Sequence, residues 1–114
     1  MTDDDRRALR LELLEKRDAL ETRLARIRAN LTRRLDADSK ERAKELEDSE
    51  VVNALGIEAI EELQLIRTTL NRLDEGEYGI CRHCGNAIGE QRLKAWPYAA
   101  ECIDCARENE KSAR

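Results

Sequence analysis

The chain has 114 residues and a net charge of −4, and 40% of its residues are charged. Aromatic residues make up 3% and phenylalanine is absent, which argues against a conventional globular core of large side chains. No apolar run approaches the roughly 18 residues that a membrane span needs, and the N-terminus, MTDDDRRALR, lacks the apolar segment of a signal peptide. We therefore expect a cytoplasmic protein with no membrane partner.

Residues 3–35 are predicted to form one long helix. Thr2 can cap its first turn, and the three aspartates that follow complement the positive end of the helix dipole. Arg17 falls where a buried residue would be due, which predicts looser packing of the N-terminal turns. The apolar positions have the spacing of a coiled-coil seam: Leu13, Leu20, Leu24, Ile27 and Leu31.

A second helix is predicted over residues 40–75, closed by Gly76, a residue type that tolerates the left-handed conformation at a helix end. Gly56 lies on its apolar stripe and costs about 1 kcal/mol of helix propensity relative to alanine, but it would let a partner helix approach closely. The stripe alternates in steps of four and three residues: Val52, Gly56, Ala59, Leu63, Ile66, Leu70 and Leu73.

Charge suggests that the two helices pair with each other. Residues 1–35 hold ten Lys/Arg and seven Asp/Glu, whereas residues 36–77 hold five and thirteen. A basic helix beside an acidic one favours an antiparallel hairpin with its tip at residues 36–41, in a monomeric protein. The alternative is that both seams pair with another copy of the chain.

Two Cys-x-x-Cys pairs, separated by seventeen residues, dominate the last third of the chain. Two such pairs supply the tetrahedral set of thiolates that Zn²⁺ prefers in structural sites: Cys81, Cys84, Cys102 and Cys105. Redox-active dithiols are the alternative, but no βαβ pattern surrounds either pair. Four thiolates leave no open position on the metal, so we expect one structural zinc ion and no enzymatic activity.

The remaining polar and aromatic residues of this module allow two interpretations each. Trp96 and Tyr98 are predicted to form a small core that seals the zinc cage onto the base of the hairpin. Their alternative role is base stacking, which the nearly neutral charge of residues 78–114 opposes. His83 is expected to be solvated or hydrogen-bonded behind the cysteines rather than a ligand, and a short helix is predicted to begin near Asp104.

The stretch GEYGICRHCGNAIGEQRLKAWPYAAECIDCAR, residues 76–107, resembles the zinc-finger segment of the DksA/TraR family of bacterial transcription regulators. The match rests on Tyr-Gly before the first cysteine, Cys-x-x-Cys-Gly, Ile-Gly, Arg-Leu-x-Ala-x-Pro and Cys-Ile-Asp-Cys. The resemblance implies a mainly α fold in two parts. Residues 1–75 would form an antiparallel coiled-coil helical hairpin, and residues 76–114 a four-cysteine zinc-finger module with a short C-terminal helix.

The resemblance also implies a function. Family members insert the hairpin into the secondary channel of RNA polymerase and modulate initiation at selected promoters, without sequence-specific DNA binding of their own. Their tip motif, Asp-x-x-Asp-x-Ala, falls on Asp38, Glu41 and Ala43, with glutamate in place of the second aspartate. Asp38 and Glu41 also have the spacing of an acidic capping box, which would explain both residues without a partner.

Other implications of the resemblance are less favourable to a full DksA-type activity. The basic residues that bind the alarmone ppGpp in DksA align with Leu65, Trp96 and Ala106, so ppGpp dependence through that site should be weak or absent.

Two alternative functions stay open. One is a protein-interaction adaptor that does not act on polymerase, and the other is a cofactor resembling the Gre transcript-cleavage factors, with Asp38 and Glu41 on a Mg²⁺ ion.

Overall fold

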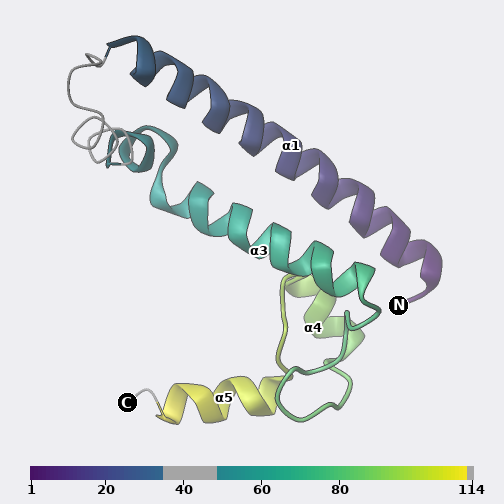
Figure 1. The fold of residues 1–114 in the computed structure, drawn as a ribbon. Coiled ribbons are helices and arrows are strands. Elements are labelled where there is room, and N and C mark those ends of the chain that lie inside the picture. Colours follow the sequence, from purple (N-terminus) through teal and green to yellow (C-terminus); the bar gives the residue numbers. More distant parts are fainter. Residues whose placement is uncertain (35–48, 113–114) are drawn as a thin grey trace. The chain divides into compact units, whose positions relative to one another are not determined.

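The computed structural model describes residues 1–34 and 49–112, and these residues are mainly helical, as predicted (Figure 1). Helix α1 spans Asp3–Arg34, and α3 spans Ile57–Asp74 after a helical stretch at residues 49–55. Helices α4 (Glu90–Ala95) and α5 (Ile103–Ser112) follow. Within these described residues, no helix is both long enough and apolar enough to cross a membrane.

Contacts between backbone segments divide the chain into two compact units. The arm unit is Leu11–Arg67, and the zinc unit combines Met1–Arg10 with Thr68–Arg114. Helices α1 and α3 contribute to both units.

Helix α1 begins with reciprocal hydrogen bonds between Thr2 and Asp5. The Asp5 backbone N–H donates to Thr2 Oγ1 at 3.1 Å, and the Thr2 backbone N–H donates to Asp5 Oδ2 at 3.0 Å. These bonds satisfy two donors that a helix start leaves unpaired, and they lower the pKa of the Asp5 carboxyl group. The predicted capping role of Thr2 is confirmed.

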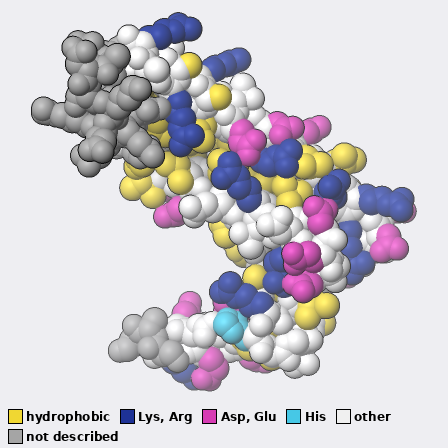
Figure 2. All heavy atoms as spheres, viewed as in Figure 1, with side chains coloured by type: hydrophobic (Ala, Val, Ile, Leu, Met, Phe, Trp, Pro, Cys, Tyr) yellow, Lys and Arg dark blue, Asp and Glu magenta, His cyan; other side chains and the backbone are white. Residues whose placement is uncertain are grey.

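The arm unit is a pair of antiparallel helices, α1 and α3, with hydrophobic side chains between charged ones (Figure 2). The Nη2 atom of Arg67 on α3 lies 3.0 Å from Glu21 Oε1 on α1. This pair has its acid on the basic helix and its base on the acidic one, the reverse of what net charge suggested. Because both side chains are partly exposed, it contributes at most about 1 kcal/mol, and burial of the seam is the larger stabilising effect.

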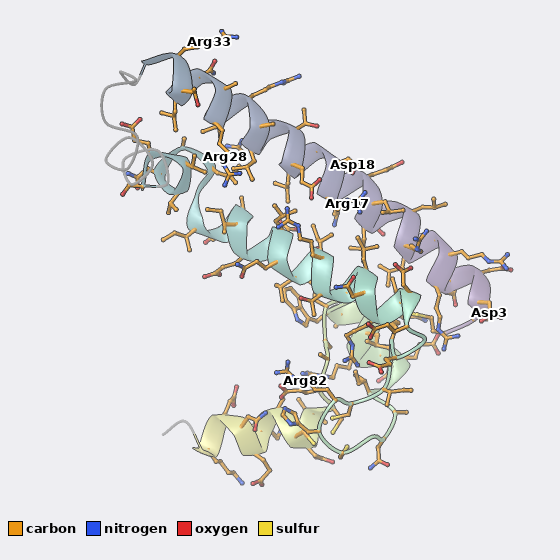
Figure 3. The ribbon with its side chains drawn as sticks, in the orientation of Figure 1. Asp3, Arg17, Asp18, Arg28, Arg33 and Arg82 are labelled. Atoms are coloured by element: carbon orange, nitrogen blue, oxygen red, sulfur yellow. The ribbon has the colours of Figure 1, made fainter. Side chains whose placement is uncertain are left out.

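The apolar seam of α1 consists of the predicted residues. Leu13 and Leu31 are buried, and Leu20, Leu24 and Ile27 between them are half-buried. Arg17 is half-buried and pairs with its neighbour Asp18 at 3.0 Å; both are labelled in Figure 3. Leu13 is only 2% exposed, so the looser packing predicted around Arg17 is not found at that position.

The second helix differs from the prediction of one continuous element over residues 40–75. Gly56 has a φ of 90° and separates the helical residues 49–55 from α3. A Cβ atom placed on Gly56 would meet nothing within 4 Å, so the residue serves the backbone conformation and not a close approach of helices. Before the break, the buried positions lie one residue earlier than the predicted stripe: Val51 and Leu55 are buried, whereas Val52 is exposed.

The zinc unit joins the ends of α1 and α3 to the cysteine-containing segment. Arg10 Nε lies 2.9 Å from Asp74 Oδ1, and α3 closes through the left-handed Gly76, with the Glu77 N–H bonded to the Arg72 carbonyl at 2.9 Å. A small core follows. Its buried members are Tyr78, Cys81, Ile88, Leu93 and Ala99. The half-buried Met1, Leu9 and Leu73 pack against them.

Candidate metal centre

A tight backbone turn presents the first cysteine pair. An isolated antiparallel bridge joins Ile80 to Ala87, and the Cys81 N–H donates to the Asn86 carbonyl at 2.8 Å. The Gly85 N–H donates back to the Cys81 carbonyl at 2.9 Å, with Gly85 at a φ of 76°, a conformation that glycine adopts without strain. These bonds direct the side chains of Cys81 and Cys84 to one side of the turn.

The start of α5 presents the second pair. Cys102 directly precedes the helix and Cys105 lies in its first turn. The Ala106 N–H donates to the Cys102 carbonyl at 2.9 Å, and the Cys105 N–H lies 3.5 Å from the Cys102 sulfur. The helix start therefore places two thiols on one side and turns a backbone donor towards one of them.

The four cysteines form one cluster that fits a zinc ion. Their Sγ atoms all lie within 4.8 Å of one another, and the Cys84 and Cys102 sulfurs are 3.7 Å apart. A tetrahedral zinc ion with Zn–S bonds of about 2.3 Å requires sulfurs about 3.8 Å apart. Among the described residues this is the group suited to a metal, and His83 is not part of it. Zinc bound here would stabilise the fold by cross-linking the two pairs.

Local hydrogen bonds shift the pKa values of Cys81, Cys84 and Cys105 in different directions. The backbone N–H groups of Cys84 and Cys102 lower the pKa of the Cys81 thiol to about 5. Hydrogen bonds from the neutral Cys105 thiol to Cys102 and Cys81 raise the pKa of Cys105, and the pKa of Cys84 is also raised, because neighbouring thiols outweigh the amide of Asn86. The Cys81 thiol therefore ionises at lower pH than the thiols of Cys84 and Cys105, and a bound cation would favour the thiolate forms.

The aromatic residues are arranged differently from the prediction. Trp96 is 49% exposed and Tyr98 half-buried, and their rings meet edge to face with centroids 5.1 Å apart. The buried aromatic residue is instead Tyr78, whose hydroxyl group donates to the Pro97 carbonyl at 2.9 Å. Burial raises the pKa of Tyr78. The prediction that Trp96 seals the cage was wrong, because the aliphatic residues around Tyr78 already fill that space.

Arg72 was not singled out by the sequence. Its guanidinium group, near the C-terminal end of α3, donates through Nη2 to the carbonyls of Glu77, at 3.1 Å, and Ile80. Ile80 directly precedes the first cysteine, so Arg72 fixes the backbone that leads into the first turn. No local sequence signal distinguishes it from an arginine that only complements the helix dipole.

A second polar group surrounds the carboxylate of Glu101. Glu101 accepts hydrogen bonds from Arg82, which is labelled in Figure 3, and from Asn109 of α5. The Nε2 atom of His83 also lies 3.2 Å from Glu101 Oε1. The bond from Arg82 is the main reason why the pKa of Glu101 is lowered.

The predicted tip residues Asp38, Glu41 and Ala43 lie outside the described residues. Their role stays a proposal.

Comparison with known families covers both parts of the chain. Residues 76–111 match the prokaryotic DksA/TraR C4-type zinc finger, and residues 9–73 match the N-terminal domain of DnaK suppressor protein-like proteins. The chain belongs to the DksA/TraR family. The zinc assignment made from cysteine spacing is therefore supported by both the family match and the clustered sulfurs.

Individual relatives of this DksA/TraR family member are similar over different lengths. An uncharacterized protein of Aquifex aeolicus is 36% identical in an alignment 87 positions long, which covers 70% of this chain and 59% of that protein. The RNA polymerase-binding transcription factor DksA of Haemophilus influenzae is 46% identical over 43 residues, 38% of this chain and 30% of that protein. The chain thus spans less than two thirds of either curated relative.

A solved structure supports the fold over nearly the whole chain. Transcription factor DksA2 from Pseudomonas aeruginosa superposes with a TM-score of 0.66 at 28% identity, covering 98% of this chain and 88% of that one. The predicted fold class, a helical hairpin with a four-cysteine module, is confirmed.

Proposed function

We propose that this chain binds RNA polymerase and regulates transcription initiation without enzymatic activity of its own. The observation that carries the proposal is the paired family match, which spans the hairpin at residues 9–73 and the zinc finger at residues 76–111. A curated relative is named as an RNA polymerase-binding transcription factor, and the similar solved structure is a transcription factor. A zinc finger alone would leave the partner open; the added hairpin match favours polymerase.

The hairpin suggests how such a protein would act. Helices α1 and α3 of the arm unit are antiparallel, so the segment between them, which contains Asp38 and Glu41, is the proposed end that enters the secondary channel. The longer side chain of Glu41, where the family motif has aspartate, moves the carboxylate by about one bond length. Activity at the polymerase active centre should therefore depend more on Asp38 than on Glu41.

We further propose that ppGpp has little effect through a DksA-type site. The three aligned positions hold Leu65, Trp96 and Ala106, which cannot provide charge-assisted bonds to phosphate groups. Leu65 and Ala106 are also half-buried.

The test is transcription in vitro from a ribosomal RNA promoter with the cognate polymerase, with and without ppGpp. We expect the wild-type protein to change transcript yield and to be retained by immobilised core polymerase. Asp38→Asn should reduce regulation at least several-fold while retention persists. Asp36→Asn is the matched control, since it removes the same charge two residues away.

Three outcomes would overturn parts of the proposal. Failure of the wild-type protein to bind core polymerase would favour the adaptor function. Shortening of backtracked transcripts that Asp38→Asn abolishes would favour a cleavage cofactor. A ppGpp-dependent gain that Trp96→Ala removes would contradict the expected independence from ppGpp.

A further inference from the structure

Four polar side chains form a network outside the zinc cage. Arg82 and His83 come from the first cysteine turn, Glu101 directly precedes Cys102, and Asn109 lies on α5. None of the four carries one of the clustered sulfurs, and the core of the zinc unit does not include them. The network is therefore separate from both the sulfur cluster and the core of the zinc unit.

The carboxylate of Glu101 is the centre of this network. Its Oε1 accepts from Arg82 Nη2 at 2.7 Å and lies 3.2 Å from His83 Nε2. Its Oε2 accepts from Asn109 Nδ2 at 2.8 Å. The Glu101 side chain is only 17% exposed, whereas the Arg82 side chain is 57% exposed. A carboxylate with partners on both oxygens and little water access is held in one position.

Along the chain, the residues of this network lie close to both cysteine pairs. Arg82 and His83 stand between the ligands Cys81 and Cys84, and Glu101 is the neighbour of the ligand Cys102. Asn109 belongs to the helix that carries Cys105. The network thus spans both cysteine pairs from outside the cage, and the Arg82 N–H adds a backbone bond to the Ala100 carbonyl at 2.9 Å.

We propose that Glu101 is a positioning residue that holds the two cysteine pairs together and slows the release of zinc. For the ion to leave, the thiolates of the two pairs must move apart, and this movement breaks the bond from Arg82 of the first turn to Glu101, which Asn109 holds in place beside the second pair. The proposal concerns the zinc site alone and does not depend on polymerase binding.

The charge of Glu101 acts on the metal in the same direction as its bonds. A carboxylate near the site attracts the departing Zn²⁺, so by charge alone its removal would also speed release. Exchange of the two partners separates the effects, because it restores a charged pair between positions 82 and 101 while it leaves an arginine at position 101.

The experiment measures the rate of zinc release from the full-length, zinc-loaded protein to the chromogenic chelator 4-(2-pyridylazo)resorcinol. We expect Glu101→Ala to release zinc about three- to tenfold faster, less than the 10- to 100-fold typical for direct partners of metal ligands. Glu108→Ala is the matched control, because Glu108 is an exposed glutamate of α5 whose one described ion pair is with Lys111 at 3.9 Å. Its release rate should equal that of the wild type.

Rescue separates positioning from a general loss of stability. Exchanging the partners, with Arg82→Glu and Glu101→Arg in one chain, should return the release rate towards that of the wild type. The cobalt-substituted Glu101→Ala protein should keep the absorption spectrum of a tetrahedral thiolate site, since the four ligands are unchanged. The proposal is overturned if Glu101→Ala releases zinc no faster than Glu108→Ala, if the exchange does not restore the rate, or if the cobalt spectrum changes.

Discussion

The arm unit buries six aliphatic side chains spread along its helices, whereas the zinc unit gathers a core cluster of five buried residues, of which Cys81 also belongs to the four clustered cysteines. In the arm, stability is shared among many similar contacts, and ion pairs such as Glu21–Arg67 add little. In the zinc unit, few residues hold the backbone, and each has a specific partner, as Arg72 does with the carbonyls of Glu77 and Ile80. Loss of one contact should therefore affect the two units differently.

The largest expected effect is loss of the metal. Cys102→Ser should lower the zinc content from one ion per chain to none and remove a contribution of roughly 10 kcal/mol to the fold of the zinc unit. The near-ultraviolet circular dichroism of Trp96 should weaken, while most of the helical signal from the arm remains. Metal analysis and circular dichroism of the two proteins measure this. Complete loss of helix would show that the arm depends on the metal as well.

In the arm, the largest single effect is expected at Ile66, which is 0% exposed. Ile66→Ala should lower the free energy of unfolding by about 2–5 kcal/mol, because it leaves a cavity in the seam. Urea unfolding of the zinc-loaded protein measures the change. Ile57→Ala is the matched control on the same helix: Ile57 is 62% exposed, and its truncation should change stability by less than about 0.5 kcal/mol.

The stability change caused by Gly56→Ala distinguishes a second helix that is broken at Gly56 from a continuous one. With a φ of 90°, Gly56→Ala should destabilise the protein by about 1–2 kcal/mol, because an L side chain strains the left-handed conformation. A continuous helix would instead gain about 1 kcal/mol from the same substitution. Gly56→Asn should cost less than alanine, since asparagine tolerates this conformation better. Thermal unfolding of the three proteins distinguishes the cases.

The smallest expected effect is a pH dependence of the zinc unit. Burial raises the pKa of Tyr78 above that of the unfolded chain, so its contribution is complete below about pH 10 and is lost as the pH rises further. Melting temperatures of the wild type should therefore fall more steeply above this pH than those of Tyr78→Phe. Equal slopes would mean that Tyr78 ionises as easily in the fold as in the unfolded chain.

Sequence patterns predicted the features that repeat or that use specific residue types. The α1 seam follows from leucine spacing, the helix start from Thr2, and the metal cluster from the two cysteine pairs. Helix α4 was not predicted, because six residues are too few to show a period.

Other features depend on contacts that local patterns do not encode. The apolar stripe runs through Gly56 in the sequence, and spacing alone cannot tell a glycine inside a helix from one that ends it. The network at Glu101 joins residues eight to nineteen positions apart in the chain, so neither helical nor strand periodicity points to it. The functional tip rests on resemblance, since Asp38 and Glu41 fit a helix cap equally well.

The break at Gly56 also determines how water reaches the arm backbone. The Ile60 N–H donates to the Gly56 carbonyl at 3.2 Å. Residues 57–59 form the start of α3, so their N–H groups have no hydrogen-bond acceptor within that helix. Amides without such partners exchange hydrogen rapidly. In hydrogen–deuterium exchange, the amides between the helical residues 49–55 and the second turn of α3 should therefore exchange before those of the buried turns around Leu63 and Ile66.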